Sequence, residues 1–464
     1  MITRATLSTW GLQLIRALSF VWVLPLLLLY LSPAQLSVWY LMFTLTRLAQ
    51  LLDCGGYPVF SRLIAYRLGD HRVSMGDGAG NVWSRIPLVV YRRALVRVFG
   101  VASLLVASML VLAGIPSTAA LAAADGVGVD AWWCLAATAA GILFMMQGLR
   151  SIAILTGCNR IVELRLAESS WGLVQIALVT VSLMWGRSLV AAVLSVQFTA
   201  VGQAVTVMLM SRRIVEPSSS AADTEAFPWS AARTQLWRSM VGQVSVTGTL
   251  HLVGALLPQF ATPALTASYL LTTRVIGMIV EIAQAPFYTL LPVLARLHAV
   301  GRGDELRQRS MGAMRQTAWL LVVGFMALVL MGAPALQWMG SRTPLLGIWL
   351  LVGLCTANLM ERFTSLHIQN YTVSGDVLWH TINGVGGGLL LAGLLLWSPW
   401  LGLGAVPLAM VTSQALWGMR FAATRSYRFM QTSGWAFERR TWLPAAAVWT
   451  AFVAIAWGVS ASAV

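Results

Sequence analysis

The chain has 464 residues, of which 58% are hydrophobic and only 10% are charged, with a mean hydropathy of +0.75. Soluble domains carry about 25% charged residues, so the composition indicates an all-α polytopic membrane protein. All 31 basic residues are arginine, and the net charge is +15. The lack of lysine excludes a P-loop nucleotide site and Schiff-base or pyridoxal catalysis. Basic loops between membrane spans explain the charge better than nucleic-acid binding does.

The predicted elements are membrane-spanning helices in two groups of six, followed by one more. A span needs about 20 mostly apolar residues, and six such stretches lie near 11–31, 36–60, 95–116, 131–155, 167–185 and 189–210. Six more lie near 239–260, 264–292, 317–336, 345–366, 378–397 and 401–422, and the last near 442–461. The predicted domains are therefore an N-terminal six-helix lobe (1–210), a polar cytoplasmic connector (211–238), a C-terminal six-helix lobe (239–425) and an extra span (426–464).

Arginines are divided unevenly between the two sides of this arrangement. If the N-terminus is placed in the cytoplasm, nearly all of the 31 arginines lie in cytoplasmic segments, and the outer loops keep only Arg187 and Arg342. Basic residues concentrate in the cytoplasmic loops of membrane proteins. We therefore predict a multi-pass protein with a cytoplasmic N-terminus.

Two arginines lie in the middle of predicted spans, and the sequence around them repeats. Thr-Arg-Leu-Ala-Gln-Leu-Leu-Asp contains Arg47, and Thr-Arg-Val-Ile-Gly-Met-Ile-Val-Glu contains Arg274, with one inserted residue. A charge inside a span usually faces a bundle interior or a wet cavity, and a duplicated arginine suggests a cavity between two related halves. The alternative is that carboxylates or carbonyl groups of neighbouring helices hold both arginines, which then only fix the bundle.

Four other ionisable residues are weaker candidates. Arg16 lies near the cytoplasmic end of the first span and either joins the two arginines or extends to the membrane surface. Glu281 follows Arg274 by seven residues and shares its helical face, whereas the six-residue spacing turns Asp53 away from Arg47. His251 lies at the middle of the seventh span and is either a proton site or a neutral hydrogen-bonded side chain. Glu281, His251 and Asp53 are the candidates for ion or proton coupling.

Two sets of residues complete the picture of a transport cavity. Glutamines could line it beside the arginines: Gln50, Gln243 and Gln284. Glycines and prolines interrupt the cytoplasmic halves of the two arginine-bearing spans and give places where each helix can bend: Gly55, Gly56, Pro58, Pro286 and Pro292.

Neither metal nor enzyme chemistry is indicated by the sequence. The four cysteines lack CxxC spacing, and His71, His298, His367 and His380 show no ligand spacing with one another or with cysteine. No loop is long enough for a folded catalytic domain. We expect a protein without catalytic residues, metal or cofactor, whose function lies in the membrane bundle.

Two segments resemble a known family. Leu51-Leu-Asp-Cys-Gly-Gly-Tyr-Pro-Val-Phe-Ser-Arg-Leu-Ile-Ala-Tyr66 is similar to an acidic-x-Gly … Arg-x-Ile-Ala pattern at the end of the second span, and Pro292-Val-Leu-Ala-Arg296 is similar to a Pro-x-x-Ala pattern at the end of the eighth. With its topology over about residues 1–425, the chain resembles the O-antigen and capsule flippases of the multidrug/oligosaccharidyl-lipid/polysaccharide (MOP) superfamily.

The resemblance implies a MATE-like fold of two six-helix lobes, related by an internal repeat, around a cationic cavity. It implies alternating-access transport of an undecaprenyl-pyrophosphate-linked oligosaccharide across the bacterial inner membrane, with polysaccharide polymerase and chain-length proteins as possible partners. The related lipid II flippase carries arginines on its first, second and eighth spans, which correspond here to Arg16, Arg47 and Arg274. The thirteenth span departs from the family's twelve- and fourteen-helix patterns.

Two other functions stay open beside the flippase hypothesis. A multidrug or small-molecule antiporter would share the fold, but drug extruders of the superfamily rely on acidic residues in the first lobe, and the first span has none. A membrane-embedded polysaccharide polymerase or glycosyltransferase is expected to carry a large outer loop with catalytic arginines or a carboxylate. The outer loops here are short and nearly free of charge.

Overall fold

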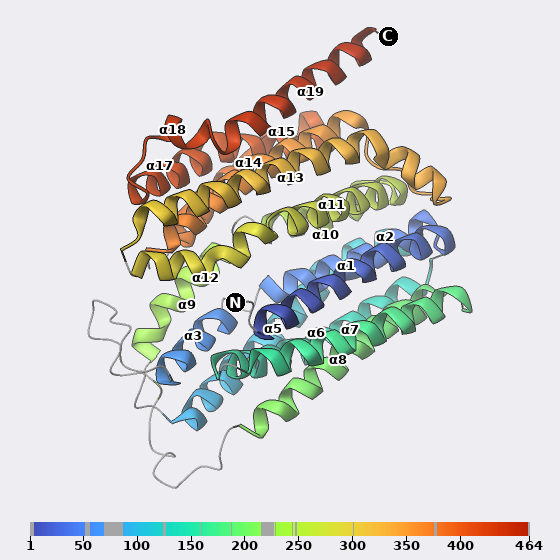
Figure 1. Cartoon of the computed structure of the whole chain (residues 1–464). Coiled ribbons are helices and arrows are strands. Elements are labelled where there is room, and N and C mark those ends of the chain that lie inside the picture. Colours follow the sequence, from blue (N-terminus) through green and yellow to red (C-terminus); the bar gives the residue numbers. More distant parts are fainter. Residues whose placement is uncertain are drawn as a thin grey trace. The chain divides into compact units, whose positions relative to one another are not determined.

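The structure is a computed structural model that describes residues 4–51, 56–68, 87–123, 127–158, 160–186, 188–214, 227, 229–243, 245, 248–299, 301–374 and 378–462. Within these ranges the regular structure is helical, with no strand, as the sequence predicts. The chain forms two compact units: residues 1–267 with 339–342, and residues 268–338 with 343–464. Figure 1 follows the helices of each unit in chain order.

The first unit contains the helices α1 to α10 and the start of α11. Their bounds are α1 Arg4–Tyr30, α2 Pro33–Leu51, α3 Gly56–Leu68, α5 Leu88–Ala122, α6 Asp130–Gly157, α7 Ile161–Met184, α8 Leu189–Arg212, α9 Trp229–Gln243 and α10 Thr249–Leu256, followed by the short 3₁₀ turn η3 Leu257–Gln259. Helix α6 packs against α5 and α8, and α7 packs against α1 and α8. Helix α10, which the sequence assigns to the second lobe, contacts α2 and α5 of this unit, and α9, most of which lies in the predicted connector 211–238, contacts α3.

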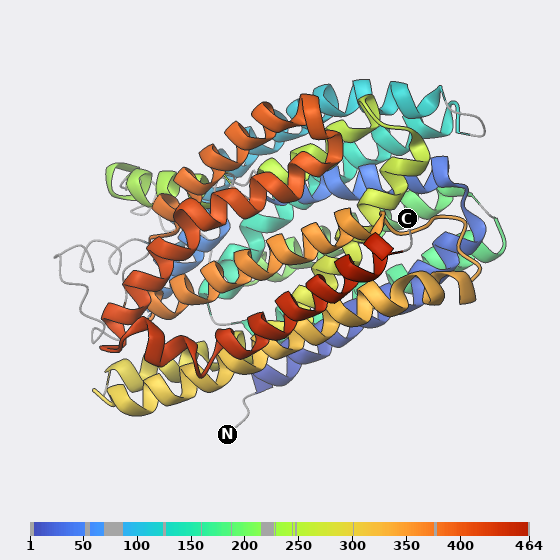
Figure 2. The same ribbon diagram turned by 90° about the horizontal axis from the view of Figure 1, so that it is seen from above.

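The second unit contains most of α11 and all later helices. Their bounds are α11 Pro263–Ala283, α12 Ala285–Ala299, α13 Gly303–Trp338, α14 Ile348–Thr372, α15 Trp379–Leu401, η4 Gly402–Gly404, α16 Ala405–Ser413, the π-helical turn η5 Gln414–Gly418, α17 Met419–Phe429, α18 Gly434–Glu438 and α19 Trp442–Ser462. Helix α13 packs against α12 and α19, and α14 packs against α16 and α17. Figure 2 shows α19 lying along α13. The helix predicted near 442–461 is thus present as α19.

Among the described residues, seven helical stretches are long and apolar enough to cross a membrane. They are α5, α6, α7, α8, α11, α13 and the continuous run from Trp379 to Phe429. Many of their large apolar side chains are exposed, including Leu105, Leu112, Leu330 and Leu395. Apolar side chains on the outside of a helical bundle are what hydrocarbon solvation requires, so the chain is a multi-pass membrane protein.

The second of the two spans that carry the central arginines is interrupted, whereas the sequence predicts one stretch over 264–292. Helix α11 ends at Ala283 and α12 begins at Ala285. Pro286 lacks an amide hydrogen and cannot complete the helical hydrogen-bond pattern. The junction lies beside Pro286, one of the residues at which the sequence predicts bending. In the other predicted span, 36–60, residues 52–55 lie outside the described residues, so the bend predicted there stays a prediction.

Candidate functional site

Arg47 lies on α2 in the first unit and is half-buried. Its Nη1 donates a hydrogen bond to Gln50 Oε1 at 3.3 Å, and its guanidinium carbon lies 5.0 Å from the centre of the Phe43 ring. Gln50 in turn donates from Nε2 to the sulfur of Met145 on α6 at 3.5 Å. A cation over an aromatic ring is stabilised by about 0.5–2 kcal/mol. These contacts orient the charge of Arg47 while the side chain of Gln50 stays exposed.

Arg274 lies on α11 in the second unit and is also half-buried. Residues seven positions apart share a helical face, so Arg274, Glu281 and Tyr288 form one row along α11 and α12. Glu281 is exposed, and 38% of Tyr288 is exposed. Arg274 and Glu281 both lie in the helix α11. Their seven-residue spacing places them on one face of it.

Gln284 stands between α11 and α12 and keeps this row aligned across the break. Its amide donates to the Val280 carbonyl at 3.1 Å, and its carbonyl accepts from the Tyr288 amide at 3.1 Å. Both are i to i−4 helical hydrogen bonds. The backbone thus continues in register through the junction, and the Gln284 side chain joins the same polar row.

Helix α14 brings an ion pair against this row. Arg362 binds the carboxylate of Glu361 through Nε and Nη2, and its Nη1 donates to Gln284 Oε1 at 2.7 Å. About two turns beyond Arg362 on α14, Gln369 Nε2 donates a hydrogen bond to the Tyr288 hydroxyl. The side chains of Arg362 and Glu361 are only 17% and 21% exposed. We call the set Arg274, Glu281, Gln284, Tyr288, Glu361, Arg362 and Gln369 the polar track of the second unit.

The structure is less informative about the other predicted site residues. Arg16 lies on α1 and Gln243 ends α9, but the side chains of both fall outside the described residues. Asp53 lies outside the described residues as well. His251 is half-buried on α10. The roles predicted for these four residues stay predictions.

The sequence interpretation missed Arg362. It placed this residue at the cytoplasmic end of a span ending near residue 366, whereas α14 continues to Thr372. Arg362 is therefore about 15 Å from the end of its helix, at 1.5 Å per residue. A pattern for it existed in the sequence: Asn358, Arg362, Ser365 and Gln369 recur at spacings of four, three and four, which places them on one helical face.

Solved structures with this fold are membrane transporters. The chain is similar to the lipid II flippase MurJ in an inward closed conformation, with a TM-score of 0.62 and 11% identity over 97% of this chain and 98% of that one. It is similar to an inward-facing multidrug resistance MATE family transporter of the MOP superfamily, with a TM-score of 0.60 and 14% identity over 89% and 96% of the two chains. A MOP superfamily transporter from Pyrococcus furiosus gives a TM-score of 0.56 and 14% identity over 92% and 95%.

No family model and no curated protein matches the sequence. At these levels of identity the likeness shows the fold alone. The chain has the MOP-type fold that MurJ and MATE transporters share, which agrees with the fold class predicted from its sequence.

Proposed function

We propose that the protein is a flippase that moves an undecaprenyl-pyrophosphate-linked oligosaccharide across the bacterial inner membrane by alternating access. The observation that carries the proposal is the pair of half-buried arginines in apolar helices, Arg47 in one unit and Arg274 in the other. A pyrophosphate is a bulky anion that needs charge compensation in a low-dielectric region. Guanidinium groups supply it through bidentate hydrogen bonds and stay charged when buried.

The contacts of Arg47 support a binding role. Phe43 and Gln50, which are both uncharged, orient its guanidinium group. The similar fold of a lipid II flippase is a further support for a lipid-linked substrate. Arg16 is the third arginine that we assign to pyrophosphate binding, on the sequence correspondence alone.

The test is complementation of a deletion strain with wild type, Arg47→Ala, Arg274→Ala and Arg47→Lys. We expect both alanine variants to lose surface polysaccharide and to accumulate lipid-linked precursor, although the variant proteins are present in the membrane at normal levels. Arg47→Lys should be intermediate, because a lysine keeps the charge but not the bidentate geometry. Arg309→Ala, on an exposed face of α13, is the matched control and should behave as wild type.

Normal polysaccharide in the deletion strain and in both alanine variants would contradict the proposal. Changed resistance to small cationic compounds in the same strains would then favour the multidrug antiporter alternative.

A further inference from the structure

We propose that the polar track of the second unit, beyond Arg274 at its end, binds the hydroxyl-rich glycan of the lipid-linked substrate, while Arg274 binds its pyrophosphate. The inference rests on the proposed function and extends it, because it assigns the sugar-recognising residues. The track lies entirely within the second unit, on α11, α12 and α14. Four of its residues were not among the candidate site residues predicted from the sequence: Tyr288, Glu361, Arg362 and Gln369.

The position of the track requires contact with water or a polar ligand. Glu281 is exposed near the end of α11, which is one of the helices apolar enough to span a membrane. A carboxylate that faces hydrocarbon is destabilising, so ionisable residues within spans face aqueous cavities or partners. From Arg274 to Tyr288 the row extends about 21 Å along the helix axis, at 1.5 Å per residue. That length exceeds what a single pyrophosphate can occupy.

The charges of the track favour a neutral ligand over a dianion. Arg362 is bound in a bidentate manner by Glu361, so its charge is already compensated. Glu281 adds a second carboxylate two helical turns from Arg274, in the same row. A pyrophosphate placed along the track would be repelled by both carboxylates, whereas sugar hydroxyl groups can both donate to them and accept from Arg362.

The uncharged members have the chemistry that recognises sugars. Gln284 and Gln369 each offer an amide with donors and an acceptor, and Tyr288 offers a hydroxyl that both donates and accepts. The ring of Tyr288 is 38% exposed, which leaves an apolar surface for the C–H face of a sugar. The existing hydrogen bonds of Gln284 to Arg362 and of Gln369 to Tyr288 fix these groups before a ligand arrives, which reduces the entropy lost on binding.

The experiment measures binding of two probes to the purified full-length protein in nanodiscs by native mass spectrometry. One probe is bare undecaprenyl pyrophosphate, and the other is the lipid-linked oligosaccharide extracted from the deletion strain. The variants are Tyr288→Phe and the double variant Gln284→Leu with Gln369→Leu. Gln308→Leu, an exposed glutamine on α13, is the matched control, and thermal midpoints verify that all variants are folded.

We expect the double variant to bind the oligosaccharide-bearing lipid about tenfold more weakly, since two hydrogen-bonding side chains are lost. Binding of the bare lipid should stay within about twofold of wild type. An equal loss for both probes, or no loss for either in a folded variant, overturns the glycan assignment. Failure of the wild type to bind either probe overturns the proposed function as well.

Discussion

Arg362 and Glu361 differ in their surroundings from ion pairs on the surface of the described chain. The pairs Arg160–Glu163 and Arg302–Glu305 join side chains of which at least one is largely exposed, and such pairs contribute about 0–1 kcal/mol. Arg362 and Glu361 are mostly buried within α14. Removing one partner of a buried pair leaves an uncompensated charge, which is far more destabilising than losing a surface pair.

We therefore predict that Arg362→Met destabilises the protein by about 3 kcal/mol. The double variant Arg362→Met with Glu361→Gln should recover a large part of this loss, because it removes both charges. Unfolding in detergent, followed by thermal midpoint or denaturant titration, measures the effect, and Arg302→Met is the surface control. Equal destabilisation by Arg362→Met and Arg302→Met would show that the burial of the α14 pair has no energetic consequence.

At the residue level, the sequence could reveal a charge only where it interrupts an apolar stretch. Arg47 and Arg274 stand out because each has apolar neighbours on both sides, and both prove to lie within helices. Arg362 follows Glu361 and precedes several polar residues, so its segment resembles the end of a span. Its hydrogen-bond partner Gln284 is 78 residues away in sequence, and only tertiary packing brings the two together.

At the level of elements, a buried cluster fastens α18 to α14 and α17. The carboxylate of Glu438 accepts hydrogen bonds from the Tyr427 hydroxyl at 2.7 Å and the Thr441 hydroxyl at 2.9 Å. His367 Nε2 lies 3.0 Å from Oε1 of the same carboxylate, and His367 is completely buried. The ring of Phe363 lies 4.4 Å from the His367 ring. Three polar side chains from three segments thus converge on one carboxylate.

The pH dependence of stability should report this cluster. Burial raises the pKa of the Glu438 carboxyl, but hydrogen bonding and charge from His367, together with the two hydroxyl groups, outweigh burial and lower the pKa below its ordinary value of 4.5. A lowered folded-state pKa stabilises the folded protein fully above about pH 4.5 and loses this effect as the pH falls through the folded-state pKa. The thermal midpoint should therefore drop on acidification below that pH.

Glu438→Gln should be less stable at neutral pH by about 1.5–3 kcal/mol and should lose less stability on acidification than the wild type. The comparison is a set of thermal midpoints at matched pH values. Glu163→Gln, at an exposed carboxylate, is the control and should keep the pH profile of the wild type. An unchanged pH profile in Glu438→Gln would assign the acid sensitivity to other groups.

Close packing of α6 against α8 depends on glycine. A Cβ atom at Gly148 would lie 3.0 Å from the Cβ and 3.2 Å from the Cα of Ala204 on α8, whereas one at Gly100 on α5 would meet nothing within 4 Å. Small residues let membrane helices approach this closely. We predict that Gly148→Leu destabilises the protein by about 1–3 kcal/mol, while Gly100→Leu has no destabilising effect. Thermal midpoints of the two purified variants provide the test.

Helix positions were largely predictable from the sequence, but helix ends and breaks were only partly so. Hydropathy locates apolar stretches such as 131–155 and 189–210, which match α6 and α8 closely. It cannot define where a helix continues into polar sequence, as α13 does from Gly303 to Trp338, because backbone hydrogen bonds persist beyond the apolar region. Pro286 indicated a bend, and the structure has a junction between α11 and α12 beside it.

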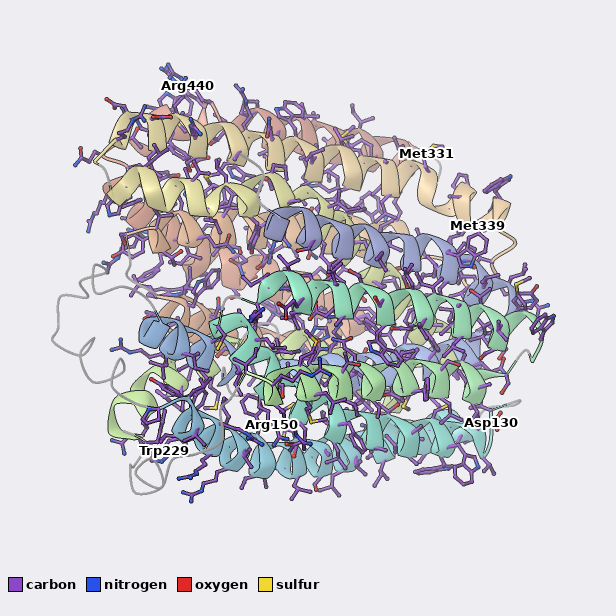
Figure 3. All side chains as sticks on the ribbon, turned by 60° about the horizontal axis from the view of Figure 1, so that its bottom comes forward. Asp130, Arg150, Trp229, Met331, Met339 and Arg440 are labelled. Atoms are coloured by element: carbon purple, nitrogen blue, oxygen red, sulfur yellow. The ribbon has the colours of Figure 1, made fainter. Side chains whose placement is uncertain are left out.

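At the level of the whole molecule, arginines concentrate at particular helix ends within each unit. In the first unit Asp130 begins α6, whereas Arg150 lies toward the other end of the same helix (Figure 3). Arg92 and Arg93 lie near the start of α5, and Arg212 ends α8. In the second unit the arginine-rich segments are the start of α13, the end of α17 and the turn before α19. The positive-inside rule predicts that these ends lie in the cytoplasm.

The direction of α19 then predicts the side of the membrane on which the C-terminus lies. Helix α19 begins at Trp442, directly after Arg439 and Arg440, and continues to Ser462. Its 21 residues extend about 30 Å at 1.5 Å per residue, which equals the thickness of the hydrocarbon core. If the arginine pair lies in the cytoplasm and α19 crosses the membrane, the C-terminus should lie on the outer side, opposite the predicted cytoplasmic N-terminus. An alkaline phosphatase fused after Val464 should therefore be active and a green fluorescent protein at the same position dark. Fusions after Thr432, before α18, should give the reverse result. A bright fluorescent fusion after Val464, with intact protein in the membrane, would contradict this prediction. Either α19 would then lie along the membrane surface or the orientation would be inverted. The activity of the Thr432 fusions decides between these two cases.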